Sequence, residues 1–437
     1  MRKIDLSAGE LSRALLGLAS TESVCILDSC GVGHLGSHLM IAGIAPVESV
    51  ELAGRSVEET LRLLEGSIRS KYAAIFTLSY DFGIRLQKLK PRFQSSEPDV
   101  FISLFDACVV HDYTSGQTFL TGNERRFDEI QTKLEDVTFT PNETDHGFNL
   151  RSNFTRTDYI EAVEIIQGLI RKGDTYQTNL TRQISTTLPS ELTAESIFWR
   201  LRTQHPAPFS SFLKRRNSAV ISASPERFFR IERGRITSSP IKGTRPRGTT
   251  VERDLNLRHE LEHSEKDRAE NTMIVDLLRN DLGRVCNYGS VIVEKLCDIE
   301  EHPSLFHLVS TINGDLRPDV SFSDILTAIF PCGSITGAPK ISTMKIIDEI
   351  ERTPRGLSMG AIAFRVPASF GLGDVIDTSV AIRTMTIENG EATCNVGGGI
   401  VIDSEPEAEF EETVVKSIAL LETLGVDPSE LSMISGV

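Results

Sequence analysis

The chain has 437 residues, of which 40% are hydrophobic and 24% are charged, which is ample for a large core and permits two or three domains. The formal net charge is −15 and no basic stripe is visible in the sequence. These features argue against a nucleic-acid partner, because such proteins gather Lys and Arg to meet phosphates. A small anionic substrate stays compatible, since it senses only the local charge of its site.

Cysteine usage and apolar runs predict the compartment. The seven cysteines are dispersed, odd in number and without a C-x-x-C pair, so they indicate neither a disulfide framework nor a zinc site. No apolar stretch follows the charged start Met1–Asp5, and no uninterrupted apolar run approaches the ~18 residues of a membrane span. We therefore expect a cytoplasmic protein with no signal peptide and no membrane partner.

The first 140 residues are predicted to be rich in strands. Val24–Asp28 is a short apolar strand, and residues 31–36 then match the dinucleotide fingerprint G-x-G-x-x-G. That fingerprint needs a helix behind it, whereas His38–Ala45 contains Gly43 and favours a second strand. The further predicted elements are a helix over Ser56–Ser70, strands over Ala73–Thr77 and Val100–Val110, and a polar linker over Thr138–Asn149.

A helix and a strand with an unusual polar face follow the linker. Apolar residues recur at helical spacing from Tyr159 to Ile170, and Gly173 ends that helix. In the predicted strand Tyr176–Ser185, one face consists of uncharged hydrogen-bonding side chains, namely Gln177, Asn179, Thr181 and Gln183. Such a row fits the lining of a polar cavity, and it fits a solvated strand edge equally well.

One stretch in the middle of the chain combines a cationic loop with a carboxylate helix. The predicted loop Ser239–Gly248 carries Lys242, with Arg245 and Arg247 close behind. Ser264 caps the helix that follows, and three polar side chains lie within one of its turns: Asp267, Glu270 and Asn271. This arrangement suits an anionic substrate bridged by a metal ion; the plain alternative is a surface loop before a salt-bridged helix.

Two strands and two histidines flank this stretch. Val220–Ser224 and Arg227–Glu232 are predicted to pair around a turn that contains Glu226. His302 and His307 lie in a short apolar segment, where a histidine is more often a packed core residue than a catalyst.

The last third of the chain has segments that suit contact between a ligand and the backbone. Gly333–Lys340 is predicted to be a loop that leads into a helix with Pro339 in its first turn, and the free N–H groups of such a start bind carboxylates. Thr378–Thr386 is a predicted strand that contains Arg383. The strand Cys394–Val401 is interrupted by three glycines, Gly397, Gly398 and Gly399, which make sense where a ligand touches the backbone.

The final predicted helix opens at a capping box over Ser404–Glu407. Glu412 and Lys416 are four residues apart on it, so their side chains are expected to be neighbours.

The order of these motifs resembles the chorismate-utilising enzyme family, strongly over Ser152–Leu424 and weakly before it. The motifs that carry the resemblance are Gly173–Leu180, Ser224–Phe228, Pro240–Thr244, Asp267–Asn271, Gly333–Lys340, Ala381–Thr384 and Gly397–Ser404. Two positions divide the branches of the family. Anthranilate synthases usually carry alanine where Lys242 stands, and isochorismate and salicylate synthases carry a lysine base in place of Gln177. Within the family, the chain therefore resembles component I of the aminodeoxychorismate synthases.

The resemblance implies an α/β fold of the α+β type, like that of anthranilate synthase component I, with two packed antiparallel sheets and helices outside. Residues 1–140 are expected to form a strand-rich N-terminal region packed on the core, and residues 152–424 the chorismate-binding catalytic region. The N-terminal region of this family can hold a tryptophan pocket, and Ile26–Ser29 and Pro206–Ser210 occupy the matching places. Asp28 departs from the usual glutamate, which argues against an effector role.

The resemblance also assigns roles to side chains. Glu270 and Glu412 would hold Mg²⁺, which prefers hard oxygen ligands and would bridge to the ring carboxylate of chorismate. Glu226 matches the general acid that protonates the leaving hydroxyl, and Lys242 matches a nucleophile that attacks the ring first. The implied substrate contacts are Gln177, Thr244, His307, Thr336, Arg383, Gly397, Gly398, Gly399 and Lys416.

The implied activity is the Mg²⁺-dependent amination of chorismate to 4-amino-4-deoxychorismate, for 4-aminobenzoate and folate synthesis. Arg245 and Arg247 are expected to favour the neutral, nucleophilic amine of Lys242. No recognisable glutaminase nucleophile occurs in the chain, so ammonia is expected from solution or from a separate glutamine amidotransferase subunit. One alternative is anthranilate synthase component I, which releases pyruvate. Another is a non-catalytic chorismate-binding subunit, against which the intact Glu226 and Lys242 argue.

Overall fold

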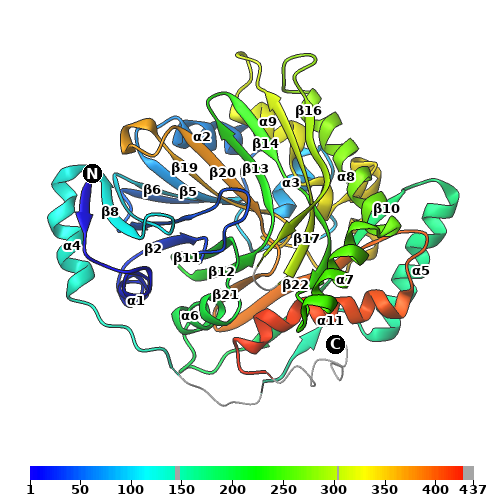
Figure 1. The fold of residues 1–437 in the computed structure, drawn as a ribbon, viewed down its shortest axis with the longest axis horizontal. Helices are drawn as coiled ribbons and strands as arrows, with labels where there is room; N and C mark the ends of the chain where they lie inside the picture. The colour runs from blue at the N-terminus through cyan, green and yellow to red at the C-terminus, as the bar shows by residue number, and fades with distance from the viewer. Residues whose placement is uncertain (143–147, 303–304, 427–437) are drawn as a thin grey trace.

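The structure, a computed structural model, describes residues 1–142, 148–302 and 305–426, and its strands form two large antiparallel sheets (Figure 1). The first sheet has 12 strands, in the spatial order β1 (Arg2–Ile4), β8 (Gln117–Gly122), β7 (Ala107–Asp112), β3 (Leu39–Ile44), β2 (Val24–Asp28), β11 (Phe209–Lys214), β12 (Ser218–Ser224), β21 (Thr384–Glu388), β22 (Glu391–Ile400), β10 (Gln177–Thr187) and β18 (Gly337–Ala338), with β9 (Arg151–Ser152) beside β10. The second sheet has 10 strands, in the order β15 (Ile241–Pro246), β17 (Leu305–Asp315), β14 (Arg235–Ser238), β13 (Arg227–Glu232), β20 (Val375–Val380), β19 (Ala361–Val366), β5 (Ala73–Leu78), β6 (Val100–Phe105) and β4 (Glu48–Leu52), with β16 (Ile292–Glu301) beside β17.

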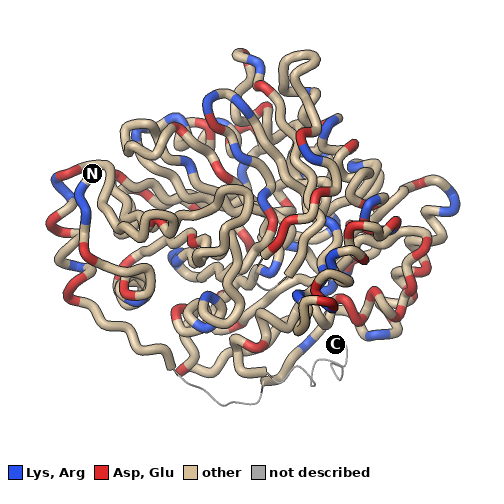
Figure 2. The backbone as a smooth tube through the Cα atoms, viewed as in Figure 1, with Lys and Arg blue, Asp and Glu red and all other residues tan. Residues whose placement is uncertain are grey.

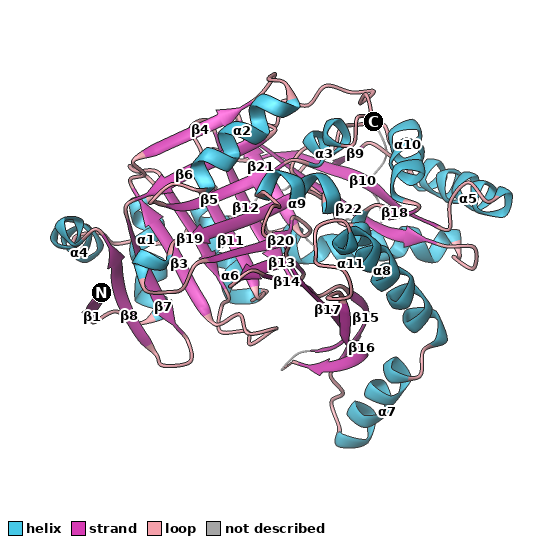
Figure 3. Cartoon of the chain, turned by 90° about the horizontal axis from the view of Figure 1, so that it is seen from above, coloured by secondary structure: helices cyan, strands magenta, loops and turns pink. Residues whose placement is uncertain are grey.

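The helices cover the outer faces of both sheets (Figure 3). They are α1 (Ala8–Leu18), α2 (Val57–Ile68), α3 (Tyr80–Leu86), α4 (Phe127–Glu135), α5 (Arg156–Lys172), α6 (Ala194–Gln204), α7 (Val251–Glu262), α8 (Glu265–Gly283), α9 (Phe322–Ile329), α10 (Lys340–Ile350) and α11 (Pro406–Glu422). One apolar core joins the first sheet to α1, α4, α5, α6 and α11, and a second joins the other sheet to α2, α3, α8 and α9. A third core lies between the sheets, where Cys25 and Ile41 meet Ile75 and Phe101. The expected fold class is confirmed.

Strands from the first 140 residues enter both sheets. β2 pairs with β11 in the first sheet, and β5 pairs with β19 in the second, so N-terminal strands share hydrogen-bond ladders with strands from the rest of the chain. The apolar segment predicted over Val100–Val110 is divided at Asp106 into β6 and β7, which belong to different sheets. Part of the predicted linker, residues 143–147, lies outside the described residues.

Two predictions about the strands that flank the site are wrong. β12 and β13 do not pair with each other, because the chain crosses from the first sheet to the second between them. The strand predicted over Thr378–Thr386 is likewise two strands, β20 and β21, in different sheets. Pro225 lacks the N–H that a ladder requires, and Arg383 has a left-handed backbone with φ of +49°, so neither segment continues as a regular strand.

The predicted loop Ser239–Gly248 is also wrong in part, because Ile241–Pro246 forms the edge strand β15. β15 pairs with β17, but the register shifts between Ile241 and Thr244, which is a β-bulge at Lys242 and Gly243. Gly243 has a φ of +87°, a conformation that suits glycine. A bulge re-aims the side chains around it, and here it sets the direction of Lys242.

The helix predictions hold better. α5 ends at Gly173, which is left-handed as expected, and α2 begins after its cap Ser56. The capping box predicted at Ser404 is wrong, because α11 starts one residue later, with Glu405 at its N-cap and Pro406 in the first turn. The Ser404 hydroxyl instead donates to Glu409 at 2.7 Å.

Among the described residues, no helix is both long and apolar enough to cross a membrane. Along the backbone drawn in Figure 2, the positions of Lys and Arg are interspersed with those of Asp and Glu.

Candidate active site

Two chain crossings between the sheets bring Glu226 and Arg383 close together. Glu226 lies between β12 and β13, and Arg383 lies between β20 and β21. The Val380 N–H donates to the Glu226 carbonyl oxygen at 3.0 Å, and the Ala223 N–H donates to the Arg383 carbonyl oxygen at 3.0 Å. The backbone at each crossing therefore forms a hydrogen bond with a strand that leads into the other crossing. These backbone hydrogen bonds fix the positions of Glu226 and Arg383.

Lys242 reaches this region from the bulge in β15. Gly243 allows β15 to pack tightly on α7 and α8, since a Cβ there would lie 2.8 Å from Leu261 and 2.9 Å from Asp267. Thr244 follows, and its hydroxyl oxygen lies 2.9 Å from His307 Nδ1 on the neighbouring strand β17. The Lys242 ammonium makes no hydrogen bond or ion pair with any residue that the structure describes, so it is available to a ligand.

The glycine run of β22 borders the site with backbone that carries no side chains. A Cβ would lie 2.0 Å from the Leu180 carbonyl oxygen at Gly397, 3.0 Å from Glu409 Oε2 at Gly398, and 2.1 Å from Gln177 Nε2 at Gly399. The Lys242 Nζ atom lies 3.5 Å from the same position at Gly399, so Gln177 and Lys242 converge there. Past Cys394, β22 pairs only with β10, which leaves one backbone edge of the glycines without a strand partner among the described residues.

The polar face of β10 is buried, so the alternative of a solvated strand edge is wrong. β10 lies between β22 and β18, and Gln177, Asn179 and Thr181 are all buried. The Thr181 hydroxyl donates to Glu351 at 2.9 Å, which places it in a structural network. Gln177 Oε1 is buried without a hydrogen-bond partner among the described residues. Of the row, Gln177 is the side chain that meets the glycine run and Lys242.

Three carboxylates form the other side of the cluster: Glu270 on α8, and Glu409 and Glu412 on α11. Burial raises the pKa of Glu270, and the nearby Glu412 carboxylate raises it further, against the opposing charge of Lys242. Burial also raises the pKa of Glu409. Sequence reasoning missed Glu409, although its spacing of three residues from Glu412 on one helix was a usable signal.

Lys416 links α11 to the glycine run. Its ammonium donates to Glu412 Oε1 at 2.6 Å and to the Gly397 carbonyl oxygen at 2.9 Å, as the spacing of four residues predicted for the first contact. Partial burial opposes ionisation of Glu412, but Lys416, Lys242 and Lys266 together outweigh it and the pKa of Glu412 is lowered. Glu412 is thus held as a carboxylate beside the less easily ionised Glu270.

Glu226 is prepared to carry a proton. Burial raises the pKa of its carboxyl group to about 7, although a hydrogen bond with Ser334 and the charges of Lys242 and Lys416 oppose the shift. Its Oε1 atom is buried and has no hydrogen-bond partner among the described residues. A carboxyl group with this pKa exchanges its proton near neutral pH, which is what a general acid requires.

Arg383 and His307 complete the cluster. Burial lowers the pKa of Arg383, and its guanidinium makes no hydrogen bond or ion pair within the described part of the chain, so it is a free binding group for an anion. Burial, reinforced by the neighbouring His34, His302 and Arg383, lowers the pKa of His307 to about 3. His307 is therefore a neutral imidazole.

Three predicted residues behave differently from expectation. Arg245 pairs with Glu260 at 2.8 Å and Arg247 pairs with Asp254 at 2.6 Å, so both cations are neutralised by helices α7 and α8 rather than directed at Lys242. Their role in activating Lys242 is not supported, because carboxylates compete for them. Thr336 is fully buried, and its hydroxyl donates to the Cys332 carbonyl oxygen at 3.0 Å within its own loop.

The two segments expected to match a tryptophan pocket line a cavity of about 260 Å³. Asp28 is at this place, and its carboxylate already accepts from the Cys30 N–H, the Tyr113 hydroxyl and Arg202, all within 2.8 Å. These three hydrogen bonds engage the Asp28 carboxylate within the protein, so it is not free to pair with an amino group. This is consistent with the expected absence of an effector role at Asp28.

The chain is similar to known proteins in both sequence and fold. Residues 36–422 match the family described as chorismate binding enzyme. The chain is 40% identical over 362 residues to aminodeoxychorismate synthase component 1 of Escherichia coli (strain K12), which covers 80% of this chain and 76% of that protein. It is also 43% identical over 263 residues to anthranilate synthase component 1 3 of Haloarcula marismortui, which covers 60% of this chain and 51% of that protein.

Among solved structures, anthranilate synthase component I from Streptococcus pneumoniae TIGR4 superposes with a TM-score of 0.78 at 26% sequence identity, covering 89% of this chain and 93% of that one. The fold and the cluster define a chorismate-binding enzyme. The chain belongs to the chorismate binding enzyme family, as its motifs predicted.

The raised pKa of Glu226 is open to direct measurement. In difference infrared spectroscopy, the signal of the Glu226 carboxyl group is the one that is lost in Glu226→Gln. We expect this signal to titrate near pH 7. The charge of Lys242 favours the carboxylate, so Lys242→Met should move this midpoint to higher pH. A wild-type midpoint near the ~4.3 of a solvated glutamate, or a downward shift in Lys242→Met, would show that burial does not control this group.

Proposed function

We propose that the chain catalyses the amination of chorismate to 4-amino-4-deoxychorismate with ammonia, in the route to 4-aminobenzoate and folate. The observation that carries the proposal is the ammonium of Lys242, which has no partner in the described part of the chain and lies beside Glu226, Glu270 and Glu412. Relatives named aminodeoxychorismate synthase component 1, at 35% to 40% identity over about four fifths of the chain, support this choice.

The two carboxylates of chorismate meet complementary charge in this site. Arg383 is a half-buried guanidinium without a partner among the described residues, and Lys416 adds a second cation beside Gly397. The edge of β22 that has no strand partner among the described residues offers backbone N–H groups as well. Together these groups bind and orient the enolpyruvyl carboxylate. The ring carboxylate of the bound substrate then faces Glu270 and Glu412.

The residues present fit Mg²⁺ on the side of the ring carboxylate. Glu270 and Glu412 supply only oxygen donors, and the half-buried Glu270 lies close enough to Glu412 for their charges to repel each other. A divalent cation relieves that repulsion, and oxygen donors are the ligands that Mg²⁺ prefers. When bound, Mg²⁺ would withdraw electron density from the substrate and orient it.

Lys242 and Glu226 divide the chemistry. In the first step Lys242, once its ammonium has released a proton to solvent, forms a C–N bond to the ring while the C–O bond to the hydroxyl group breaks, and Glu226 donates the proton that lets the hydroxyl leave as water. In the second step ammonia forms a new C–N bond, the bond to Lys242 breaks, and the proton lost by the new amine returns to Glu226. The sum is chorismate and ammonia converted to aminodeoxychorismate and water.

Ammonia is supplied in this proposal by a separate glutamine amidotransferase subunit. The name "component 1", borne by the relatives from Escherichia coli and Bacillus subtilis, supports a second component.

Anthranilate synthase activity is the second candidate, favoured by the relative from Haloarcula marismortui and by the structure from Streptococcus pneumoniae. Lys242 separates the two, because a covalent lysine adduct serves amination without the loss of pyruvate.

The product and the role of Lys242 are tested together. Wild-type protein with chorismate, ammonia and Mg²⁺ should form aminodeoxychorismate, identified by mass spectrometry, and no pyruvate. Lys242→Ala and Lys242→Arg should both lose most of the amination, since arginine keeps the charge but is not a nucleophile. Pyruvate in stoichiometric amount would contradict the proposed product. High amination by Lys242→Arg would show that the lysine only offsets charge.

The metal assignment predicts a defined dependence on Mg²⁺. Glu270→Gln and Glu412→Gln each remove one anionic ligand, so each should raise the Mg²⁺ concentration needed for half-maximal activity at least about tenfold, with partial rescue at high Mg²⁺. Glu411→Gln is the matched control, because Glu411 lies on the same helix but pairs with Arg156 at 2.6 Å. A normal Mg²⁺ requirement in Glu270→Gln or Glu412→Gln would refute that residue's role as a ligand.

A further inference from the structure

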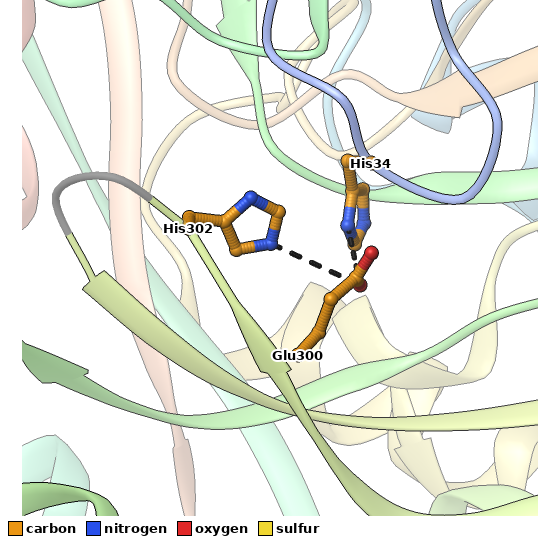
Figure 4. Close-up of side chains that lie close together, drawn as sticks. All are labelled: His34, Glu300 and His302. Atoms are coloured by element: carbon orange, nitrogen blue, oxygen red, sulfur yellow. Dashed lines mark ion pairs between the residues drawn. The ribbon is translucent and has the colours of Figure 1, made fainter. Parts of the chain in front are cut away.

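Three side chains from distant parts of the chain converge beside the active site (Figure 4). His34 comes from the segment between β2 and β3, Glu300 from β16, and His302 directly follows β16. Their ligand atoms all lie within 4.8 Å of one another. His34 is 1% exposed and His302 is 5% exposed, so the cluster is an interior feature.

The polar atoms of the cluster lack proper partners within the described residues. Both ring nitrogens of His34, Glu300 Oε2 and His302 Nε2 are buried and make no hydrogen bond. His34 Nδ1 lies 2.6 Å from Glu300 Oε2 and His302 Nε2 lies 3.8 Å from the same oxygen, as ion-pair contacts only. Buried polar groups are normally satisfied, so one ligand atom from each of these three side chains, gathered within 4.8 Å, is the arrangement expected where a ligand completes the set.

We propose that His34, Glu300 and His302 bind a divalent transition-metal ion, with Zn²⁺ as the best match. Two imidazoles and one carboxylate are a common protein ligand set for Zn²⁺, with further positions filled by water. Tetrahedral ligands at about 2.0–2.2 Å from zinc lie roughly 3.3 Å from one another. The separations of His34 and His302 from Glu300 are 2.6 Å and 3.8 Å, on either side of that value, and all three ligand atoms lie within 4.8 Å of one another.

The ligand chemistry separates this site from the carboxylates proposed to hold Mg²⁺. Imidazole nitrogen suits Zn²⁺, Co²⁺ and Ni²⁺, whereas Mg²⁺ is held by oxygen. Glu270 and Glu412 offer oxygen alone, while two of the three donors here are nitrogen.

Backbone contacts hold the proposed ligands in place. The Leu35 N–H donates to Glu300 Oε1 at 3.3 Å, so one carboxylate oxygen is held by backbone while the other, Oε2, faces His34 and His302. Arg227 donates to the Leu35 carbonyl oxygen at 2.7 Å, which anchors the segment that carries His34. Such outer contacts fix ligand orientation in metal sites.

The metal would connect the N-terminal segment to the strands that carry the active site. The His302 ring centroid lies 5.4 Å from that of His307, and His307 contacts Thr244 on β15. β15 also carries Lys242. A metal bound by His34, Glu300 and His302 therefore ties the first sheet to the edge of the second and restrains the strand of the proposed nucleophile.

The test is metal binding by the full chain. After chelation and dialysis, titration with Zn²⁺ alone should give one tight equivalent by calorimetry, and Co²⁺ should give the visible absorption of a nitrogen-ligated, low-symmetry site. His34→Asn, Glu300→Gln and His302→Asn should each weaken Zn²⁺ binding at least about tenfold. Glu300→Gln keeps the side-chain size, so circular dichroism of this variant separates lost binding from lost folding.

An exposed histidine pair provides the control. His259 and His263 stack at 4.0 Å on α7, a spacing that also captures metal at protein surfaces. The double variant His259→Asn/His263→Asn should keep the tight equivalent. The proposal is overturned if this double variant loses the binding, if Glu300→Gln binds Zn²⁺ as wild type does, or if wild type shows no nitrogen-ligated Co²⁺ spectrum, which would leave the cluster as a plain His34–Glu300 ion pair.

Discussion

The site depends on one constraint, which is that the chain passes from one sheet to the other at two neighbouring points. The peptide groups around Glu226 and Arg383 bond to each other's flanking strands, so both crossings keep one geometry. The Glu226 carboxyl group and the Arg383 guanidinium are thereby held at the crossings. Neither group would have this position if its segment continued as a strand of one sheet. Their placement needs the ladders of both sheets, and N-terminal strands such as β2 and β5 extend those ladders.

The cluster combines cations that have no partner in the described part of the protein with neighbouring carboxylates. Lys242 and Arg383 have no partner among the described residues, while Glu270 is half-buried near a second carboxylate. Burial of groups left unpaired is costly, so this arrangement is expected where a ligand completes the set. The dianionic substrate and divalent cation of the proposed reaction would complete both halves at once. The raised pKa of Glu226 belongs to the same balance, since the cations near it are too few to ionise it fully.

Local pattern predicted much of the fold and part of the site. Helices α2 and α5 follow from apolar spacing and caps, and the contact between Glu412 and Lys416 follows from a spacing of four. The crossings could not be predicted, because apolar and polar residues alternate along a strand in the same way whichever sheet the strand joins. The sequence predicts a loop at β15, because Pro and Gly are turn formers. In the structure a bulge and an edge position accommodate these residues in a strand. The convergence of His34 with Glu300 depends on tertiary contacts alone, and no local signal reports them.

The central claim is that Lys242 is a nucleophile and not only a charge. The most direct test is peptide mass mapping of wild-type protein incubated with chorismate and Mg²⁺ in the absence of ammonia. The account predicts a peptide containing Lys242 that carries the mass of chorismate less water, and predicts that added ammonia discharges it. An unmodified Lys242 under these conditions, in protein that still aminates chorismate when ammonia is added, would contradict the account.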